Sequence, residues 1–223
     1  LKRIKPEIKL KEIVRLSNEN SINIIYLNNH DFAKYFNRNN KQEGITQGVL
    51  GFVQDFKYKT LREIVENNKK IVNPLILILD EITDPHNLGA IARSAVCLGA
   101  DGIIIPRHNS AEVNHTVLKT SSGAINYISI AKETNLSNSI KFLKDNGYWI
   151  LGTDIQAVQN TFDTDFKKPI GLVIGSEGSG MRKNIKGHCD ILIRIPMAGK
   201  LNSLNASVSA GVILYEIFRQ KNS

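Results

Sequence analysis

From Pro74 onward, the order of hydrophobic and polar positions predicts strands and helices that alternate. Short apolar runs are separated by stretches in which apolar residues recur at helical spacing. Leu75–Leu79 is apolar throughout, as is typical of a strand covered on both faces. This pattern predicts an α/β fold with a mostly parallel sheet and helices on both faces.

The expected elements of this part can be stated by residue range. We expect strands at Leu75–Leu79, Gly102–Ile105, Tyr127–Ile130, Tyr148–Gly152, Ile170–Ile174 and Ile191–Ile195. We expect helices at Leu88–Leu98, Glu112–Lys119, Leu136–Asn146 and Leu204–Arg219, the first of them closed by Gly99. Parallel sheets bind ligands beyond the carboxyl ends of their strands, so the loops that follow the strands are where chemistry is expected.

Residues 1–70 have the pattern of a small α/β unit, with a linker that ends near residue 73. The expected elements are helices at Glu7–Leu16, Asp31–Phe36 and Thr60–Asn67 and strands at Ile22–Tyr26 and Ile45–Val53. These are few elements for an independent α/β domain. Because the chain begins with Leu1 and not with methionine, we expect this unit to be incomplete at its start.

The formal charge of +8 is unevenly spread. Residues 1–70 hold 14 Lys and Arg against 8 Asp and Glu, whereas residues 71–223 hold 15 against 13. A basic front end favours a polyanionic partner such as nucleic acid. The alternative is that lysine is simply abundant in this chain.

Several classes of function are disfavoured. No apolar window reaches 18 residues, so we expect no membrane span. Cys97 and Cys189 stand apart from one another and from histidine clusters, so we expect no metal site and two free thiols in a cytoplasmic protein.

The loop after the first strand carries two candidates, Asn87 and Arg93. Asn87 is well placed as the N-cap of the next helix, and capping alone would explain it. Arg93 is the one charged residue between Asp84 and Asp101, in a helix of small and apolar residues. An isolated arginine in such a helix usually has an anionic partner or a function, and both side chains can face the loop edge of the sheet.

Two later loops carry the other candidates. Gly175-Ser176-Glu177-Gly178-Ser179-Gly180 follows a buried strand and matches neither a dinucleotide fingerprint nor a P-loop. Three glycines in six residues indicate a backbone that approaches something closely, although a solvated turn is the simpler alternative. The last loop, from Ile195, contains Ser203 and Asn205, either of which can cap the final helix.

The final helix opens with the small residues Ala206, Ser207, Ala210 and Gly211. Such residues let a second backbone come close. We expect a neighbouring helix or a second subunit to pack there, and a homodimer built on this part of the chain.

Together these loops resemble the SpoU (TrmH-like) class of the SPOUT superfamily of RNA 2′-O-ribose methyltransferases. Asn87 to Arg93, Gly175 to Gly178, and Ile195 to Ser207 resemble its first, second and third motifs over about residues 74–223. The stretches 80–95 and 172–181 resemble above all the bacterial 23S rRNA guanosine 2′-O-methyltransferases. Residues 1–70 more weakly resemble the L30e-like substrate-binding domain of that family.

The resemblance implies a C-terminal trefoil knot, S-adenosyl-L-methionine as cofactor, S-adenosyl-L-homocysteine as product, and no metal. It implies cofactor contacts from Thr153, Gly175, Gly178, Ile195 and Leu204. It implies that Arg93 activates or orients the ribose hydroxyl, that Asn87 and Glu177 hold Arg93 and the substrate, and that Ser203 and Asn205 shape the site. An ordinary arginine stays protonated, so whether Arg93 acts as a base or as a positioning cation is open.

Three functions are compatible with the residues. The first is methylation of 23S rRNA. The second is the same reaction on tRNA, which the L30e-like front part disfavours. The third is an RNA-binding or ribosome-assembly protein without catalysis, which the complete set of motif residues disfavours.

Overall fold

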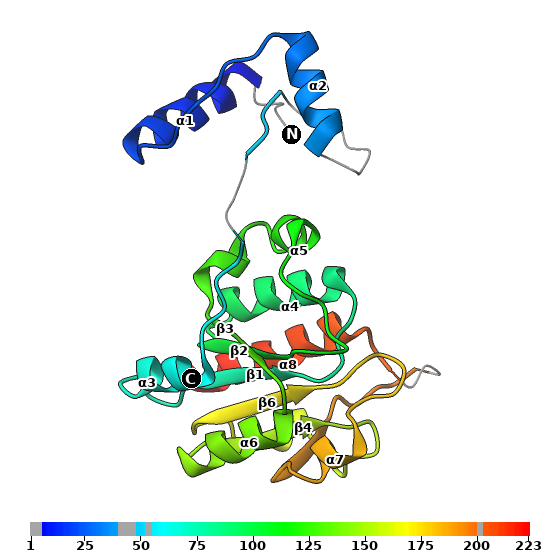
Figure 1. Cartoon of the computed structure of the whole chain (residues 1–223). Coiled ribbons are helices and arrows are strands. Elements are labelled where there is room, and N and C mark those ends of the chain that lie inside the picture. Colours follow the sequence, from blue (N-terminus) through cyan, green and yellow to red (C-terminus); the bar gives the residue numbers. More distant parts are fainter. Residues whose placement is uncertain (1–5, 40–47, 52–54, 200–202) are drawn as a thin grey trace. The chain divides into compact units, whose positions relative to one another are not determined.

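A computed structural model describes residues 6–39, 48–51, 55–199 and 203–223 of the chain (Figure 1). It contains two compact units, Leu1–Asp55 and Phe56–Ser223. The boundary lies earlier than residue 73, because helix α3 (Leu61–Asn68) belongs to the second unit. Its side chains Leu61, Ile64 and Val65 are buried in that unit's core. The identity of the front part as a substrate-binding domain stays a prediction.

The first unit contains helices α1 (Pro6–Glu19) and α2 (Asn29–Asn39), as the sequence pattern predicts. The expected strand at Ile22–Tyr26 is wrong. Ile22, Ile25 and Tyr26 are exposed, and no strand in the described part of the chain pairs with this segment. The expected strand Ile45–Val53 falls mostly outside the described residues, and residues 48–51 are not in a strand.

The second unit is built on one seven-stranded sheet in the order β3-β2-β1-β6-β4-β7-β5, with every neighbouring pair parallel. This confirms the predicted α/β class. The strands are β1 (Leu75–Leu79), β2 (Gly102–Pro106), β3 (Ile130–Glu133), β4 (Trp149–Thr153), β5 (Gln159–Asn160), β6 (Ile170–Ile174) and β7 (Ile191–Arg194). The helices after α3 are α4 (Pro85–Cys97), α5 (His115–Thr120), α6 (Leu136–Asp145), α7 (Lys183–Lys186) and α8 (Ala206–Lys221), with 3₁₀ turns η1 (Ala124–Tyr127) and η2 (Thr161–Asp163).

Helices cover both faces of the sheet (Figure 1). In β1, Leu75, Leu77 and Leu79 pack into the core shared with α4 and α8. Ile76 and Ile78 point the other way, into the core shared with α3, α6 and α7. This explains why the whole strand is apolar: both of its faces are buried.

Several boundaries differ from the sequence expectations, and α5, for example, begins at His115 and not at Glu112. Strand β3 begins at Ile130, because Tyr127 ends η1 with its side chain exposed. Helix α4 begins at Pro85, and its N-cap is Asp84, whose carboxylate accepts a hydrogen bond from the His86 backbone at 2.8 Å. Proline lacks the N–H that a first helical position leaves unpaired, so this start is favourable. Asn87 is therefore not the cap and lies inside the first turn.

Strand order brings the three candidate loops to one edge. Strand β6 lies between β1 and β4, and β7 lies beyond β4. The loops after β1, β4, β6 and β7 therefore leave the sheet side by side, and the Asp80 backbone donates to the Ile174 carbonyl at 2.8 Å where β1 and β6 end.

Candidate cofactor and catalytic site

A cavity of about 610 Å³ lies at the carboxyl ends of β4, β6 and β7. All the predicted cofactor residues line it: Thr153, Gly175, Gly178, Ile195 and Leu204. Glu177 and Ser203 line it as well. Sequence reasoning did not single out other parts of the wall, among them Asp154, Gln156, Lys186, Ser209 and Ile213. These residues carry no motif of their own, and the fold alone brings them together.

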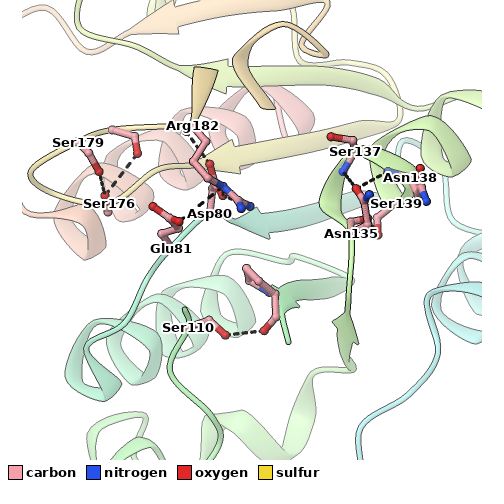
Figure 2. Close-up of polar contacts among 12 residues, drawn as sticks. Asp80, Glu81, Ser110, Asn135, Ser137, Asn138, Ser139, Ser176, Ser179 and Arg182 are labelled. Carbon is pink, nitrogen blue, oxygen red and sulfur yellow. Dashed lines mark hydrogen bonds and ion pairs between the residues drawn. The ribbon is translucent and has the colours of Figure 1, made fainter. Parts of the chain in front are cut away.

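The glycine loop from Gly175 to Gly180 is a tight backbone turn. Ser176 and Gly180 exchange backbone hydrogen bonds of 3.1 and 3.0 Å, and the two hydroxyls of Ser176 and Ser179 lie 2.7 Å apart (Figure 2). A Cβ at Gly175 would lie 2.3 Å from backbone atoms of Gly180 and Met181, so no side chain fits there. At Gly178 nothing lies within 4 Å of the corresponding position, which opens onto the cavity.

An ion pair between a buried carboxylate and a partly exposed guanidinium anchors the end of this loop. The Asp80 carboxylate, which is 0% exposed, accepts from the Arg182 backbone N–H and from its Nε, both at 2.8 Å (Figure 2). The Arg182 Nη2 lies 2.7 Å from the same carboxylate. Sequence reasoning missed this pair. A usable signal was present, because Asp80 follows directly on a strand buried on both faces, where a carboxylate needs a partner.

Asn87, Glu177 and Asn205 meet in one hydrogen-bonded cluster. Asn87 Nδ2 donates to Glu177 Oε1 at 2.9 Å, and Asn205 Nδ2 donates to Asn87 Oδ1 at 3.0 Å and also to Glu177 Oε1. Asn205 is the N-cap of α8, with its Oδ1 accepting from Ser207 and Val208. The predicted cap at position 205 is thus confirmed, and Ser203 is not the cap.

Arg93 lies outside this cluster. It is exposed on α4, and its Nη1 donates to Ser122 Oγ at 3.2 Å. The structure brings Asn87 to Glu177, but in the described part of the chain it shows no hydrogen bond or ion pair from either side chain to Arg93, which the resemblance implies that they hold.

One carboxylate on the cavity wall has a shifted pKa. Burial of Asp154 acts to raise its pKa, but hydrogen bonds from the Lys186 side chain and the Gln156 backbone, with the Lys186 charge, lower it on balance. Asp154 therefore stays ionised beside Lys186. Within the described residues no group of His, Cys, Asp and Glu has the arrangement of a metal site, and no helix is long and apolar enough to cross a membrane.

Comparison with known proteins identifies the family. Residues 74–215 match the model of the SpoU rRNA Methylase family. The chain belongs to this family. The match covers β1 through most of α8, and so includes every loop described above.

Two curated SpoU/TrmH relatives illustrate the match. The TrmH-family protein YacO of Bacillus subtilis (strain 168) is 45% identical over 180 residues, which are 80% of this chain and 72% of that protein. A TrmH-family protein of Staphylococcus saprophyticus is 41% identical over 219 residues, which are 96% of this chain and 84% of that protein.

Solved SpoU structures agree with this fold. The SpoU methyltransferase AviRb from Streptomyces viridochromogenes has a TM-score of 0.66 at 30% identity, covering 71% of this chain and 63% of that one. AviRb has also been solved in complex with the cofactor AdoMet, with a TM-score of 0.63 at 33% identity, covering 68% of this chain and 59% of that one. An AdoMet-bound rRNA methyltransferase from Sinorhizobium meliloti has a TM-score of 0.67 at 29% identity, and the match covers 73% of this chain and 61% of that one. This chain spans less than two thirds of each of these solved chains.

Proposed function

We propose that this protein is an S-adenosyl-L-methionine-dependent RNA methyltransferase that modifies a ribose 2′-hydroxyl, that of a guanosine in 23S rRNA. The observation that carries the proposal is the cluster of Asn87, Glu177 and Asn205. Three loops that are distant in sequence meet there, beside a glycine-lined cavity. The family's rRNA description and the rRNA methyltransferase from Sinorhizobium meliloti support the RNA class.

The cavity fits the cofactor. Its volume of about 610 Å³ falls in the range of small-molecule sites, about 300–1,000 Å³. Ile174, Ile193 and Ile195 supply apolar wall of the kind an adenine ring needs, and the glycine loop supplies main-chain groups. Asp154 supplies the acceptor oxygens that hydroxyl or ammonium groups need. The residues present would therefore hold S-adenosyl-L-methionine, which supplies an activated methyl group when bound.

The protein's own part in the reaction is to position the ribose. Arg93 is a permanent cation with a planar set of donors, so it suits binding a phosphate and a neighbouring hydroxyl together. The cluster of Asn87, Glu177 and Asn205 holds the helix that carries Arg93 against the glycine loop. Aligning the two reactants in this way removes much of the entropic barrier to transfer.

The homodimer also belongs to this proposal. We place its interface on a different side of α8 from the small residues at the start of that helix. Ala206 and Ala210 are buried inside the protomer, where α8 packs on α4. The apolar residues that α8 leaves exposed are Val208, Val212, Tyr215 and Phe218. Their spacing places them along one side of the helix, and we propose that a second copy covers them.

Three further expectations stay predictions, namely the trefoil knot, the L30e-like identity of the first unit and the cytoplasmic location. The convergence of residues 175–180 with Ile195, Met197, Ser203 and Leu204 on one cavity supports the knot.

The decisive experiment maps 2′-O-methylation in RNA. Ribosomal RNA and tRNA from cells with and without the protein are digested and compared by mass spectrometry. We expect one 2′-O-methylguanosine in 23S rRNA to disappear without the protein and to return with the wild type but not with Arg93→Ala. Loss of a tRNA methyl group instead would identify the tRNA reaction. If 2′-O-methylation is the same with and without the protein, and calorimetry detects no cofactor binding, the RNA-binding protein without catalysis is the remaining alternative.

A further inference from the structure

The face of α4 that carries Arg93 packs unusually close to the end of α5. His86, Gly89 and Arg93 share this face, because they stand three and seven residues apart. At Gly89 a Cβ would lie 2.7 Å from Thr120 Cβ and 3.1 Å from the Ser121 backbone nitrogen. Any side chain at position 89 would therefore push the two segments apart.

Several hydrogen bonds hold the turn after α5. Ser121 is fully buried, and its hydroxyl donates to the Leu118 carbonyl at 3.2 Å. Backbone hydrogen bonds of 3.0 Å run from Ser122 to Lys119 and from Gly123 to Leu118. Ser122 itself has φ +53°, in the left-handed region that residues with a side chain seldom occupy. A position of this kind persists when its surroundings determine it, and it often serves a site.

This turn presents one side chain to Arg93. Ser122 Oγ lies 3.2 Å from Arg93 Nη1 and accepts its hydrogen. The partner is neutral, whereas Glu177, the carboxylate of the adjacent cluster, is already bonded to Asn87 and Asn205. A hydroxyl orients the guanidinium without neutralising it, so the full positive charge stays available to an anionic substrate.

We propose that Ser122 is a positioning residue for methyl transfer. Held by its turn and by the close approach at Gly89, it fixes the orientation of the Arg93 guanidinium before RNA binds. The inference rests on the proposed function, because it takes Arg93 to be the group that meets the ribose. It assigns to the segment after α5 a task that none of the three family motifs contains.

Two substitutions separate the hydroxyl from the backbone. Ser122→Ala removes the hydroxyl and keeps the unfavourable φ, whereas Ser122→Gly removes the hydroxyl and relieves the backbone. If Ser122 acts through its hydroxyl, both variants lose single-turnover methylation at saturating RNA by about fivefold to twentyfold, the size expected for one hydrogen bond. The Kd for S-adenosyl-L-methionine and the KM for RNA stay unchanged. Melting stays as in the wild type for Ser122→Ala and moves upward for Ser122→Gly.

Controls come from the same chain. Ser137→Ala removes a serine hydroxyl on α6, which covers the opposite face of the sheet, and transfers methyl at the wild-type rate. In the background of Arg93→Ala, adding Ser122→Ala lowers the rate no further, because the group that Ser122 orients is already gone.

The outcomes distinguish this inference from the proposed function. If Arg93→Ala is inactive while both Ser122 variants match the wild type, the inference is wrong and the proposed function stands. If Ser122→Gly is fully active and Ser122→Ala is not, the backbone matters and the hydroxyl does not, which also overturns it. If Arg93→Ala transfers methyl at the wild-type rate, Arg93 is not the cation that positions the ribose. Both the proposed mechanism and the inference then fail.

Discussion

Asn87 on α4 donates a hydrogen bond of 2.9 Å to Glu177, although 90 residues of chain separate them. The same carboxylate oxygen also accepts from Asn205 and, at 3.4 Å, from the backbone of Ala206 at the start of α8. One oxygen thus joins the helix after β1, the loop after β6 and the loop after β7. The geometry of the site depends on a charged acceptor at this point, because charge-assisted hydrogen bonds are the stronger kind.

Glu177→Gln tests that dependence. The amide keeps the shape of the side chain but offers a weaker, neutral acceptor to two asparagine donors. We expect methyl transfer to fall by about tenfold to a hundredfold, equivalent to about 1.4–2.7 kcal/mol, with the fold intact by circular dichroism. Wild-type activity in a single-turnover assay would show that the cluster is dispensable.

Two of the glycines that line the cavity, Gly175 and Gly178, should respond differently to substitution. Gly178 has open space around it, so Gly178→Val should fold normally and lose affinity for S-adenosyl-L-methionine at least tenfold in calorimetry, because its side chain enters the cavity. Gly175→Ala meets backbone atoms instead, so it should lower the free energy of unfolding by about 1–3 kcal/mol or more. Full affinity in folded Gly178→Val would remove this loop from the cofactor site.

The sequence pattern predicted the centre of the second unit's sheet well because strands β1, β2 and β6 are fully buried. A short apolar run such as Leu75–Leu79 or Ile170–Ile174 buries all its side chains best as a strand covered on both faces. Both strands occur at those residues. Prediction failed at Ile22–Tyr26, where β-branched residues favoured a strand but the described part of the chain offers no partner strand. The five residues to which the family resemblance assigns cofactor contacts all line the cavity, and their contact with a cofactor stays a prediction.

The partners of individual side chains were harder to foresee. Asparagine is a residue type that often caps helices, so Asn87 was a reasonable candidate. Nothing in the local sequence shows that Asp84 takes that role or that Asn87 bonds to Glu177. Arg93 is bonded to Ser122, in a segment without any recognisable motif. Such pairings depend on how distant elements pack, which periodicity and capping preferences do not encode.

The dimer proposal predicts that Val212→Glu gives a monomer. Val212 is 42% exposed, so the charge should leave the protomer folded while it disrupts an apolar contact between copies. Val158→Glu, at an even more exposed valine outside α8, is the matched control and should keep the wild-type mass. Light scattering at micromolar concentration measures both, and a monomeric wild type would contradict the arrangement.

Removal of the first unit should weaken RNA binding without loss of the cofactor site. The deletion should end at residue 55, because a deletion to residue 70 would remove the core side chains of α3. Residues 1–55 hold 9 Lys and Arg against 6 Asp and Glu, so they contribute only part of the surplus charge. We expect a smaller salt dependence of RNA binding and an unchanged cofactor Kd. An unchanged salt slope would place the phosphate contacts in the second unit.

The two thiols should differ in reactivity. Burial raises the pKa of Cys189 to about 12, whereas Cys97 is exposed on α4. At pH 8 we expect iodoacetamide to modify Cys97 and to spare Cys189 until the protein is denatured, as mass spectrometry would show. The unfolded thiol ionises near pH 8.5 and the folded one near 12, so this residue costs stability as the pH rises between these values. Rapid labelling of Cys189 in the native protein would contradict its burial.

The order of the strands has a consequence for synthesis on the ribosome. Strand β1 pairs on one side with β2, which follows soon after it, but on the other side with β6, which begins about 95 residues later. At the usual ~5–20 residues per second, the inner edge of β1 waits for roughly 5–20 s with its backbone hydrogen-bonding groups unpaired. The nascent chain therefore passes through an incomplete sheet with an unpaired strand edge that can pair with other chains. The candidate site is complete only when the last helix has left the exit tunnel.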